Sequence, residues 1–369
     1  MTHEHVDTIV IGGGQAGLAM GYHLRRKGVP FTILDGEQRV GDVWRNRWDS
    51  LRLFTPTRYS QLPGMRFPGP GGTGPTKDEM AGYLEAYARH FELPVRSGTV
   101  VDRLWRADDR FVVGAGDRRY TADQVVVATG ALRNPWRPSF AGELDPRIVQ
   151  LHSAEYRNRS QLAPGGVLLV GAGNSGSDIA LDVAAYHPTW LAGRHPGHVP
   201  FRIEGRATRH LVHVVRFAGH HVITRRNPIG RRLIPKLMAG GDPVVRIKAK
   251  DVDAAGIECV PRVAGVQDGL PRLDDGRVLN VANVIWCTGF RQTFPWIDLP
   301  VFGADGAPDH RRGIVDAVPG LYFLGLEFQF SVTSEIISGV GRDAAYVARH
   351  LARRRGAQPS APSPALTPA

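Results

Sequence analysis

Two copies of one glycine-rich pattern, 159 residues apart, constrain the fold of this chain more than any other feature. The first copy follows a β-branched run at 7–11 and has glycine at 12, 14 and 17. The second follows a similar run at 167–170 and has glycine at 171, 173 and 176. A helical pattern continues from each copy. One G-x-G-x-x-G is weak evidence, but two copies, each between a strand and a helix, strongly indicate two dinucleotide-binding units.

Each turn is expected to hold a pyrophosphate. Glycines let the backbone approach the ligand closely, and the N-terminus of the following helix supplies N–H donors with a partial positive charge. The candidate contacts are Gly12, Gly14, Gln15 and Gly17 in the first unit, and Gly171, Gly173, Asn174, Ser175 and Gly176 in the second.

The two units differ where the second strand ends and the adenosine ribose is read. Asp35 lies 18 residues after Gly17, and Arg194 lies 18 residues after Gly176. A carboxylate accepts hydrogen bonds from ribose hydroxyls and repels a 2′-phosphate, whereas a guanidinium binds that phosphate. The first unit is therefore predicted to hold FAD and the second NADPH. The alternative, that both residues are ordinary surface charges, stays open at this point.

A second matched pair of segments predicts how the units are connected. Buried strands end in Ala128-Thr129-Gly130 and in Cys287-Thr288-Gly289, on either side of the second fingerprint. We therefore expect an α/β fold with two Rossmann-like domains, the NADPH domain inserted into the FAD domain. The predicted division is 1–149 and 285–355 for the FAD domain, 150–284 for the NADPH domain, and a disordered Pro/Ser/Ala-rich tail at 356–369. Further candidate cofactor contacts at strand ends are Thr129, Gly130, Thr288, Gly289 and Gly325.

The net charge of +11 is concentrated in one segment. Residues 194–250 hold 13 Lys and Arg against 2 Asp and Glu, and the remainder is neutral. No nucleic-acid-binding motif accompanies this charge, so we expect no nucleic-acid partner. We favour a solvated helical face over the substrate channel, and a contact with an anionic membrane surface remains open. The segment's histidines lack nearby carboxylates or thiols, so no metal is expected.

The cysteine count and the apolar runs exclude other classes. The two cysteines, Cys259 and Cys287, can form neither a disulfide framework nor a C-x-x-C pair, which excludes a thiol–disulfide reductase. No apolar run approaches the length of a spanning helix, about 18 residues. The first residues lack the hydrophobic core of a signal peptide. A cytoplasmic location is the expectation.

With these motifs the chain resembles the class B flavin-dependent monooxygenases, and in particular their short bacterial flavin-containing monooxygenase-like members. Besides the fingerprints and the two Thr-Gly strand ends, the likeness rests on Gly41-Asp-Val-Trp44, on Leu53-Phe-Thr-Pro56 and on His152 to Tyr156. Gly142 lies ten residues before His152, where the family signature has four.

The resemblance implies roles for individual residues. It places Trp44 near the flavin, offers Phe54 either as a wall beside the isoalloxazine or as plain packing, and gives His152 a positioning role at the domain hinge. It also implies a helix from about Thr333–Ser334 whose N-terminus faces the flavin pyrimidine. It names no catalytic acid or base, so none is assigned.

The resemblance also implies a reaction. NADPH reduces FAD, the reduced flavin captures O2 as a C4a-(hydro)peroxide, and a soft nucleophile, a sulfide or an amine of a small molecule, is oxygenated. The alternatives are a Baeyer–Villiger or hydroxylating enzyme, and a non-catalytic redox-sensing flavoprotein. A homodimer is left open.

Overall fold

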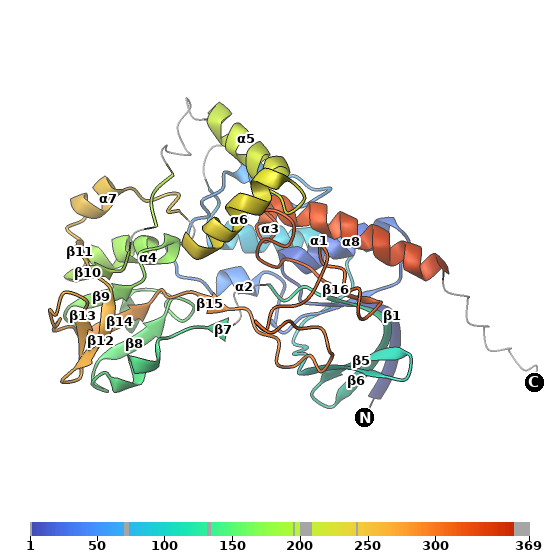
Figure 1. Cartoon of the computed structure of the whole chain (residues 1–369), viewed down its shortest axis with the longest axis horizontal. Coiled ribbons are helices and arrows are strands. Elements are labelled where there is room, and N and C mark those ends of the chain that lie inside the picture. Colours follow the sequence, from blue (N-terminus) through green and yellow to red (C-terminus); the bar gives the residue numbers. More distant parts are fainter. Residues whose placement is uncertain are drawn as a thin grey trace, which may run out of the picture.

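The computed structural model describes residues 2–69, 74–130, 134–194, 196–199, 209–240 and 243–357. Within them the two larger sheets lie at opposite ends of an elongated molecule, with helices along one side (Figure 1). Residues 200–208 of the basic segment and the tail from 358 lie outside the described residues, while residues 356 and 357, expected in the disordered tail, form the end of the last helix.

The first sheet has seven strands in the order β3-β2-β1-β6-β5-β4, with β16 also paired to β6. Its central strands are parallel, as expected for a dinucleotide-binding unit. The strands are β1 (Thr2–Ile11), β2 (Thr32–Leu34), β3 (Val95–Arg96), β4 (Arg103–Ala107), β5 (Arg110–Ala115), β6 (Arg118–Val127) and β16 (Leu321–Phe323). The helices of this part are α1 (Gln15–Arg26), α2 (Asp42–Arg45), η1 (Thr57–Tyr59), α3 (Lys77–His90) and α8 (Ile337–Ala357).

Alternate residues of β1 face two different apolar layers. Val10 packs in the layer that contains Leu18 of α1 and Leu351 of α8. Ile9 and Ile11 pack on the other face, together with residues of β5, β6 and the segment 294–302. All three side chains are at most 2% exposed. The β-branched run therefore forms a strand that is buried on both faces, which fixes the position of the turn that follows it.

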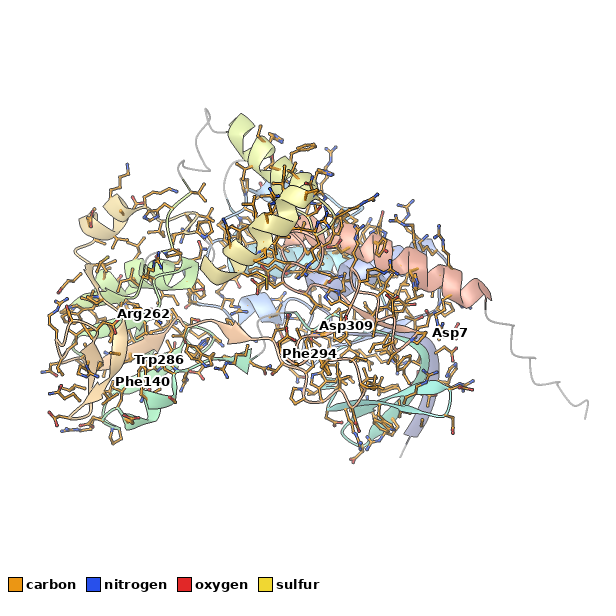
Figure 2. All side chains as sticks on the ribbon, in the orientation of Figure 1. Asp7, Phe140, Arg262, Trp286, Phe294 and Asp309 are labelled. Carbon is orange, nitrogen blue, oxygen red and sulfur yellow. The ribbon has the colours of Figure 1, made fainter. Side chains whose placement is uncertain are left out.

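The second sheet is parallel throughout, in the order β11-β10-β9-β14-β8. Phe140 and Trp286 pack edge to face in its apolar layer, with ring centroids 6.1 Å apart (Figure 2). The strands are β8 (Val149–His152), β9 (Val167–Val170), β10 (Thr189–Ala192), β11 (Glu258–Val260) and β14 (Asn283–Trp286), and β12 (Val263–Gln267) pairs separately with β13 (Leu270–Leu273). The helices are η2 (Ser139–Glu143), η3 (Arg159–Gln161), α4 (Asn174–Ala184) and α7 (Ala249–Ala254).

The structure corrects one expected domain boundary and the expected start of the last helix. The return to the first unit was expected after residue 284, but that position lies inside β14, which pairs with β9 and β8 of the second sheet. The chain instead crosses between the units at β7 (Asn134–Pro135) and β15 (Phe290–Arg291), which pair antiparallel. The last helix begins at Ile337, three residues after Ser334, because Ser331, Thr333 and Ser334 hydrogen-bond within a turn.

The basic segment forms a helical projection above the two sheets (Figure 1). It contains α5 (Arg209–Phe217), a π-helical turn η4 (Ala218–Val222) and α6 (Pro228–Gly240). Val214, Phe217 and Met238 are among its exposed apolar side chains. Among the described residues, no helix is both long and apolar enough to cross a membrane.

Glycine at position 17 is required by packing alone. A Cβ there would lie 1.8 Å from the carbonyl oxygen of Gly12. We therefore predict that Gly17→Ala destabilises the protein by about 3 kcal/mol or more, because the turn must open to admit the methyl group. Gly82→Ala is the matched control, since position 82 is exposed, lies within α3 and has no atom within 4 Å of an added Cβ.

The control substitution should stabilise the protein by about 0.5–1 kcal/mol through helix propensity. Urea unfolding followed by circular dichroism measures both changes. Equal effects of the two substitutions would contradict the packing assigned to Gly17.

Candidate functional site

The first fingerprint is a turn in which two glycines serve the fold and a third is open. Gly12 has a φ of +111°, and a Cβ there would lie 2.5 Å from the carbonyl oxygen of Ala128. Gly17 is required by its contact with Gly12. At Gly14, in contrast, an added Cβ would meet nothing within 4 Å. Packing inside the protein therefore leaves room at Gly14, where a ligand can approach the backbone.

The N-terminus of α1 faces the same open position. Gly14 is its N-cap and provides no side-chain cap, and the first turn holds no acidic residue. The first N–H groups of the helix and its partial positive charge are thus available to an anion. Gln15 donates from Nε2 to the carbonyl of Glu335 at 3.0 Å, which ties this end of α1 to the segment before α8.

Asp35 lies directly after β2, beside this turn. It is 9% exposed, and its carboxylate is so close to Gly13 that a Cβ at position 13 would lie 2.7 Å from Oδ2. The backbone N–H of Asp35 donates to Arg96 and its carbonyl accepts from Thr99. The carboxylate is therefore held at the mouth of the turn, where a ribose would meet it.

The second fingerprint repeats this geometry. Gly171 has a φ of +114°, and a Cβ there would lie 2.3 Å from the carbonyl oxygen of Cys287. A Cβ at Gly176 would lie 1.8 Å from the oxygen of Gly171, while Gly173 is open. Ala128 and Cys287 thus have equivalent positions: the carbonyl group of each packs closely against the first glycine of the neighbouring turn.

Asn174 distinguishes the second turn from the first. Its Nδ2 donates to the carbonyl of Pro243 at 3.2 Å, and its Oδ1 accepts from the N–H of Val245 at 3.0 Å. The segment after α6 is therefore held against the N-terminus of α4. Ser175 follows Asn174 in the first turn of that helix, and Gly173 precedes it as the N-cap.

The register of β10 corrects the equivalence of Asp35 and Arg194. Gly12 donates to the carbonyl of Leu34 at 2.8 Å, and Gly171 donates to that of Ala192 at the same distance. Asp35 therefore corresponds to Gly193, and Arg194 lies one residue farther on. The equal spacing misleads because the chain between Gly176 and the strand end is one residue shorter than its counterpart. Because Gly193 has no side chain, it places nothing at the position that the Asp35 carboxylate has in the first unit. Arg194 is exposed next to this position.

The two Thr-Gly strand ends have different surroundings. Thr129 and Gly130 border a cavity of about 210 Å³. Thr288 donates from Oγ1 to the carbonyl of Trp136, and Gly289 has a φ of +82°. Gly325, just after β16, has a φ of +79°, and a Cβ there would come within 3.1 Å of the Ala16 side chain. A role of these residues in cofactor binding stays a prediction.

His152 is buried at the end of β8 with both ring nitrogens occupied. The N–H of Ala154 donates to Nδ1 at 3.1 Å, so Nε2 carries the proton and donates to the carbonyl of Gly289 at 3.0 Å. Burial lowers the pKa of the imidazole below its usual value. The ring therefore positions the Gly289 strand end as a neutral donor, and it has no free lone pair for acting as a base.

Trp44 has a buried donor without a partner among the described residues, and Phe54 has an exposed aromatic side chain. Trp44 Nε1 is buried and has no hydrogen-bond partner among the described residues. Such an orphaned donor is unusual in an interior and fits a polar ligand atom beside α2. The Phe54 ring is 41% exposed, so it is not plain core packing. These observations fit a flavin near this loop.

One contact between the units was not anticipated from the sequence. Trp48 of the first unit donates from Nε1 to Oδ2 of Asp178 in α4 at 3.0 Å, and Arg246 forms an ion pair with the same carboxylate. Nearby, Asn158 donates to Asp49 at 2.7 Å. The only sequence signal was the acid two residues after Gly176, on a helix that begins at a nucleotide site.

Comparison with known proteins gives a family. A family model described as pyridine nucleotide-disulphide oxidoreductase matches residues 9–190. The chain is 41% identical, over 93% of its length and 97% of the relative, to an uncharacterized CzcO-like oxidoreductase of Geobacillus kaustophilus. It is 30% identical, over 93% of its length and 87% of the relative, to a probable indole-3-pyruvate monooxygenase of Arabidopsis thaliana. The chain belongs to the flavin-dependent monooxygenase family.

A solved structure agrees with this membership. The flavin-containing monooxygenase from Stenotrophomonas maltophilia is 29% identical, with a TM-score of 0.77, over 95% of this chain and 99% of that one. The resemblance drawn from the motifs is thus confirmed, and so is the fold class of two Rossmann-like units. The protein is a flavoprotein oxidoreductase, and FAD and NADPH are the cofactors of this family.

The open glycines provide a paired test of ligand placement. Alanine is sterically free at Gly14 and at Gly173, so both variants should fold and the stability of the apoprotein should be unchanged. We predict that Gly14→Ala yields colourless protein, because the methyl group occupies the space of the pyrophosphate. Gly173→Ala should keep its flavin and lose about tenfold in NADPH affinity, which corresponds to about 1.4 kcal/mol.

Flavin absorbance of the purified proteins and stopped-flow flavin reduction measure the two effects, and each variant is the control of the other. The assignment fails if Gly14→Ala retains a full complement of FAD.

The neutral state of His152 has a consequence for pH dependence. Because its pKa is lowered on folding, unfolding takes up a proton below pH 6.5, so stability is complete above that pH and declines as the pH falls toward the folded pKa. Between pH 6.5 and 9 we predict parallel rate profiles for the wild type and His152→Asn, since an amide can donate and accept similarly. Loss of one limb of the kcat/KM profile in the variant would identify His152 as an acid or base instead.

Proposed function

We propose that this protein is an FAD-containing, NADPH-dependent monooxygenase that uses O2 to oxygenate a sulfur or nitrogen atom of a small molecule. The observation that carries the proposal is the contrast between two otherwise equal turns. The first presents the carboxylate of Asp35, and the second presents a glycine followed by Arg194. A carboxylate suits the ribose of FAD, and a vacant position beside a guanidinium suits the 2′-phosphate of NADPH.

FAD is assigned to the first unit. In this proposal the N-terminus of α1 and the open backbone at Gly14 hold the pyrophosphate, and Asp35 binds the ribose. Trp44 Nε1 supplies a donor near the ribityl chain or ring, and Phe54 covers one side of the isoalloxazine. Gly12 and Gly17 act indirectly, since they set the shape of the turn.

NADPH is assigned to the second unit. Here Gly173, Ser175 and the N-terminus of α4 hold the pyrophosphate, while Asn174 keeps the 243–245 segment in place. Arg194 binds the 2′-phosphate from the edge of the sheet. His152 fixes the Gly289 strand end between the units, and Trp48 and Asp178 set the distance between the two sites.

The chain's own residues orient and enclose the cofactors. When bound, the flavin supplies the redox chemistry, accepting hydride from NADPH and activating O2. A monooxygenase of this kind needs no dedicated acid–base pair, which agrees with the fully occupied ring of His152. A cytoplasmic location and a homodimer remain part of the proposal.

A product screen tests the reaction. We predict that a sulfide or a tertiary amine stimulates NADPH consumption, with one oxygenated product formed for each NADPH used. A sulfide such as thioanisole, a tertiary amine and a cyclic ketone would be compared by product mass and oxygen consumption. A lactone formed from the ketone alone favours the Baeyer–Villiger alternative. Tight FAD without turnover of any substrate favours the redox sensor.

Coenzyme preference tests the assignment of Arg194. A charge-assisted contact with phosphate contributes roughly 1.5–3 kcal/mol. Arg194→Gln should therefore raise the KM for NADPH by about tenfold or more, and the KM for NADH should change by less than about threefold. The rate of flavin reduction at saturating NADPH should stay nearly the same, because the contact is made equally in the ground state and in the transition state.

Arg147→Gln is the control for this experiment, because Arg147 is exposed in the same unit and pairs with Asp145. An unaltered preference in Arg194→Gln, or an NADH-preferring wild type, refutes the assignment.

A further inference from the structure

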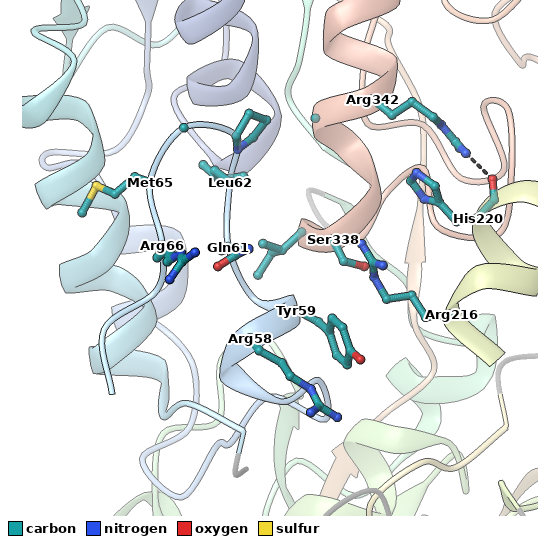
Figure 3. A pocket seen from close by; sticks show the side chains of 14 residues that line it. Arg58, Tyr59, Gln61, Leu62, Met65, Arg66, Arg216, His220, Ser338 and Arg342 are labelled. Atoms are coloured by element: carbon teal, nitrogen blue, oxygen red, sulfur yellow. Dashed lines mark hydrogen bonds between the residues drawn. The ribbon is translucent and has the colours of Figure 1, made fainter. Parts of the chain in front are cut away.

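A cavity of about 430 Å³ is lined by no residue of either glycine turn. Figure 3 shows the side chains that line it. It is an open pocket lined by the loop 58–66, by α5 with the following π-helical turn, and by the start of α8. Its volume is that of a small-molecule site.

The charge of this cavity has one sign. Among the described residues, four arginines and no acidic side chain line it: the four are Arg58, Arg66, Arg216 and Arg342. They come from three separate parts of the chain, so the arrangement is made by the fold. Asp343, next to the last of them, is fully buried and pairs with Arg312 and Arg342, accepting also from Ser334 at 2.6 Å.

His220 lines the cavity, and its pKa is affected by the nearby arginines. This lining residue donates or accepts through Nδ1 at Thr333 Oγ1, 3.0 Å away. Burial, together with the smaller effect of the neighbouring Arg342 and Arg216, lowers its pKa to about 4. A neutral imidazole among guanidinium groups adds no charge and leaves the cavity cationic near neutral pH.

Two of the arginines are held in place by an aromatic ring. The guanidinium carbons of Arg58 and Arg216 lie 4.8 Å and 5.0 Å from the centre of the Tyr59 ring, and Tyr59 itself is hydrogen-bonded to His213. The Nε atoms of both arginines are buried without a hydrogen-bond partner among the described residues. Preorganised donors of this kind favour an incoming anion, because little side-chain entropy remains to be lost.

One segment borders both this cavity and the candidate flavin site. Ser338 lines the cavity, and three residues earlier the carbonyl of Glu335 accepts from Gln15 at the N-terminus of α1. On the other side, Arg58 and Tyr59 follow Phe54 within one short loop.

We propose that this cavity binds the anionic group, a carboxylate or a phosphate, of a small molecule. Arg58 and Arg216 make the primary contacts, and Arg66 contributes from the rim. The anionic group has two possible sources, the substrate itself or a separate ligand. That the anionic group belongs to the substrate rests on the proposed function. That the cavity binds an anion does not depend on it.

Isothermal titration of the FAD-loaded protein, with NADP+ present to fill the second unit, tests the site. The probes are inorganic phosphate, 3-(methylthio)propanoate and its neutral amide. We expect saturable binding of at least one anion and about tenfold weaker binding of the amide, as for loss of one charge-assisted contact.

Arg216→Gln should weaken anion binding by about tenfold, and Arg66→Gln, at an exposed position, by a smaller factor. Arg231→Gln is the control, because Arg231 is exposed on α6 of the same basic segment and outside the cavity. The proposal is overturned if neither anion binds saturably, or if Arg231→Gln weakens binding as much as Arg216→Gln.

Turnover separates the two sources. If the anionic group belongs to the substrate, the propanoate has a lower KM than its amide, and Arg216→Gln raises the KM of the propanoate alone. If it belongs to a separate ligand, the acid and the amide are oxygenated alike, and phosphate still binds. Absence of oxygenation with intact anion binding contradicts the proposed function and leaves the anion site standing.

Discussion

The architecture depends on one close contact, made twice: the approach of a glycine turn to the carbonyl at the end of a neighbouring strand. Gly12 meets Ala128 in this way, and Gly171 meets Cys287. A side chain at either glycine would separate the turn from the sheet. The contact places a helix N-terminus beside an open backbone position in each unit, a geometry that suits an anion. Differences in function then arise outside the turn, at the neighbouring strand end.

The distance between the two sites is the next constraint, since in the proposed reaction a hydride would pass between cofactors bound to the two units. Two features connect the units. The antiparallel pair β7 and β15 carries the chain in both directions, and Trp48 reaches across to Asp178, which Arg246 also holds. His152 braces the strand end that leads into β15. The interface is thus built from hydrogen bonds near the second nucleotide site, where a bound coenzyme would reinforce it.

Local patterns predicted the strands, the turns and their order, because β-branched runs followed by glycine depend little on distant residues. They failed where contacts between distant residues determine which sheet a strand joins or where an element begins and ends. The strand that ends at Cys287 belongs to the second sheet, Arg194 lies one residue beyond the place of Asp35, and α8 begins after a serine-rich turn. The cationic cavity was not predictable, because three of its four arginines lie outside the basic segment 194–250, in distant parts of the sequence. Likewise, nothing near Trp48 in the sequence indicates its partner on α4.

The central claim, that each turn holds a different dinucleotide, is tested most directly by amide hydrogen exchange with mass spectrometry. The FAD-loaded protein would be compared with and without NADP+. The account predicts that NADP+ slows exchange over 171–178 and around Arg194, and leaves 12–18 unchanged. Removal of FAD should speed exchange over 12–18. Protection of 12–18 by NADP+, or equal protection of both turns, would contradict the assignment of the two sites.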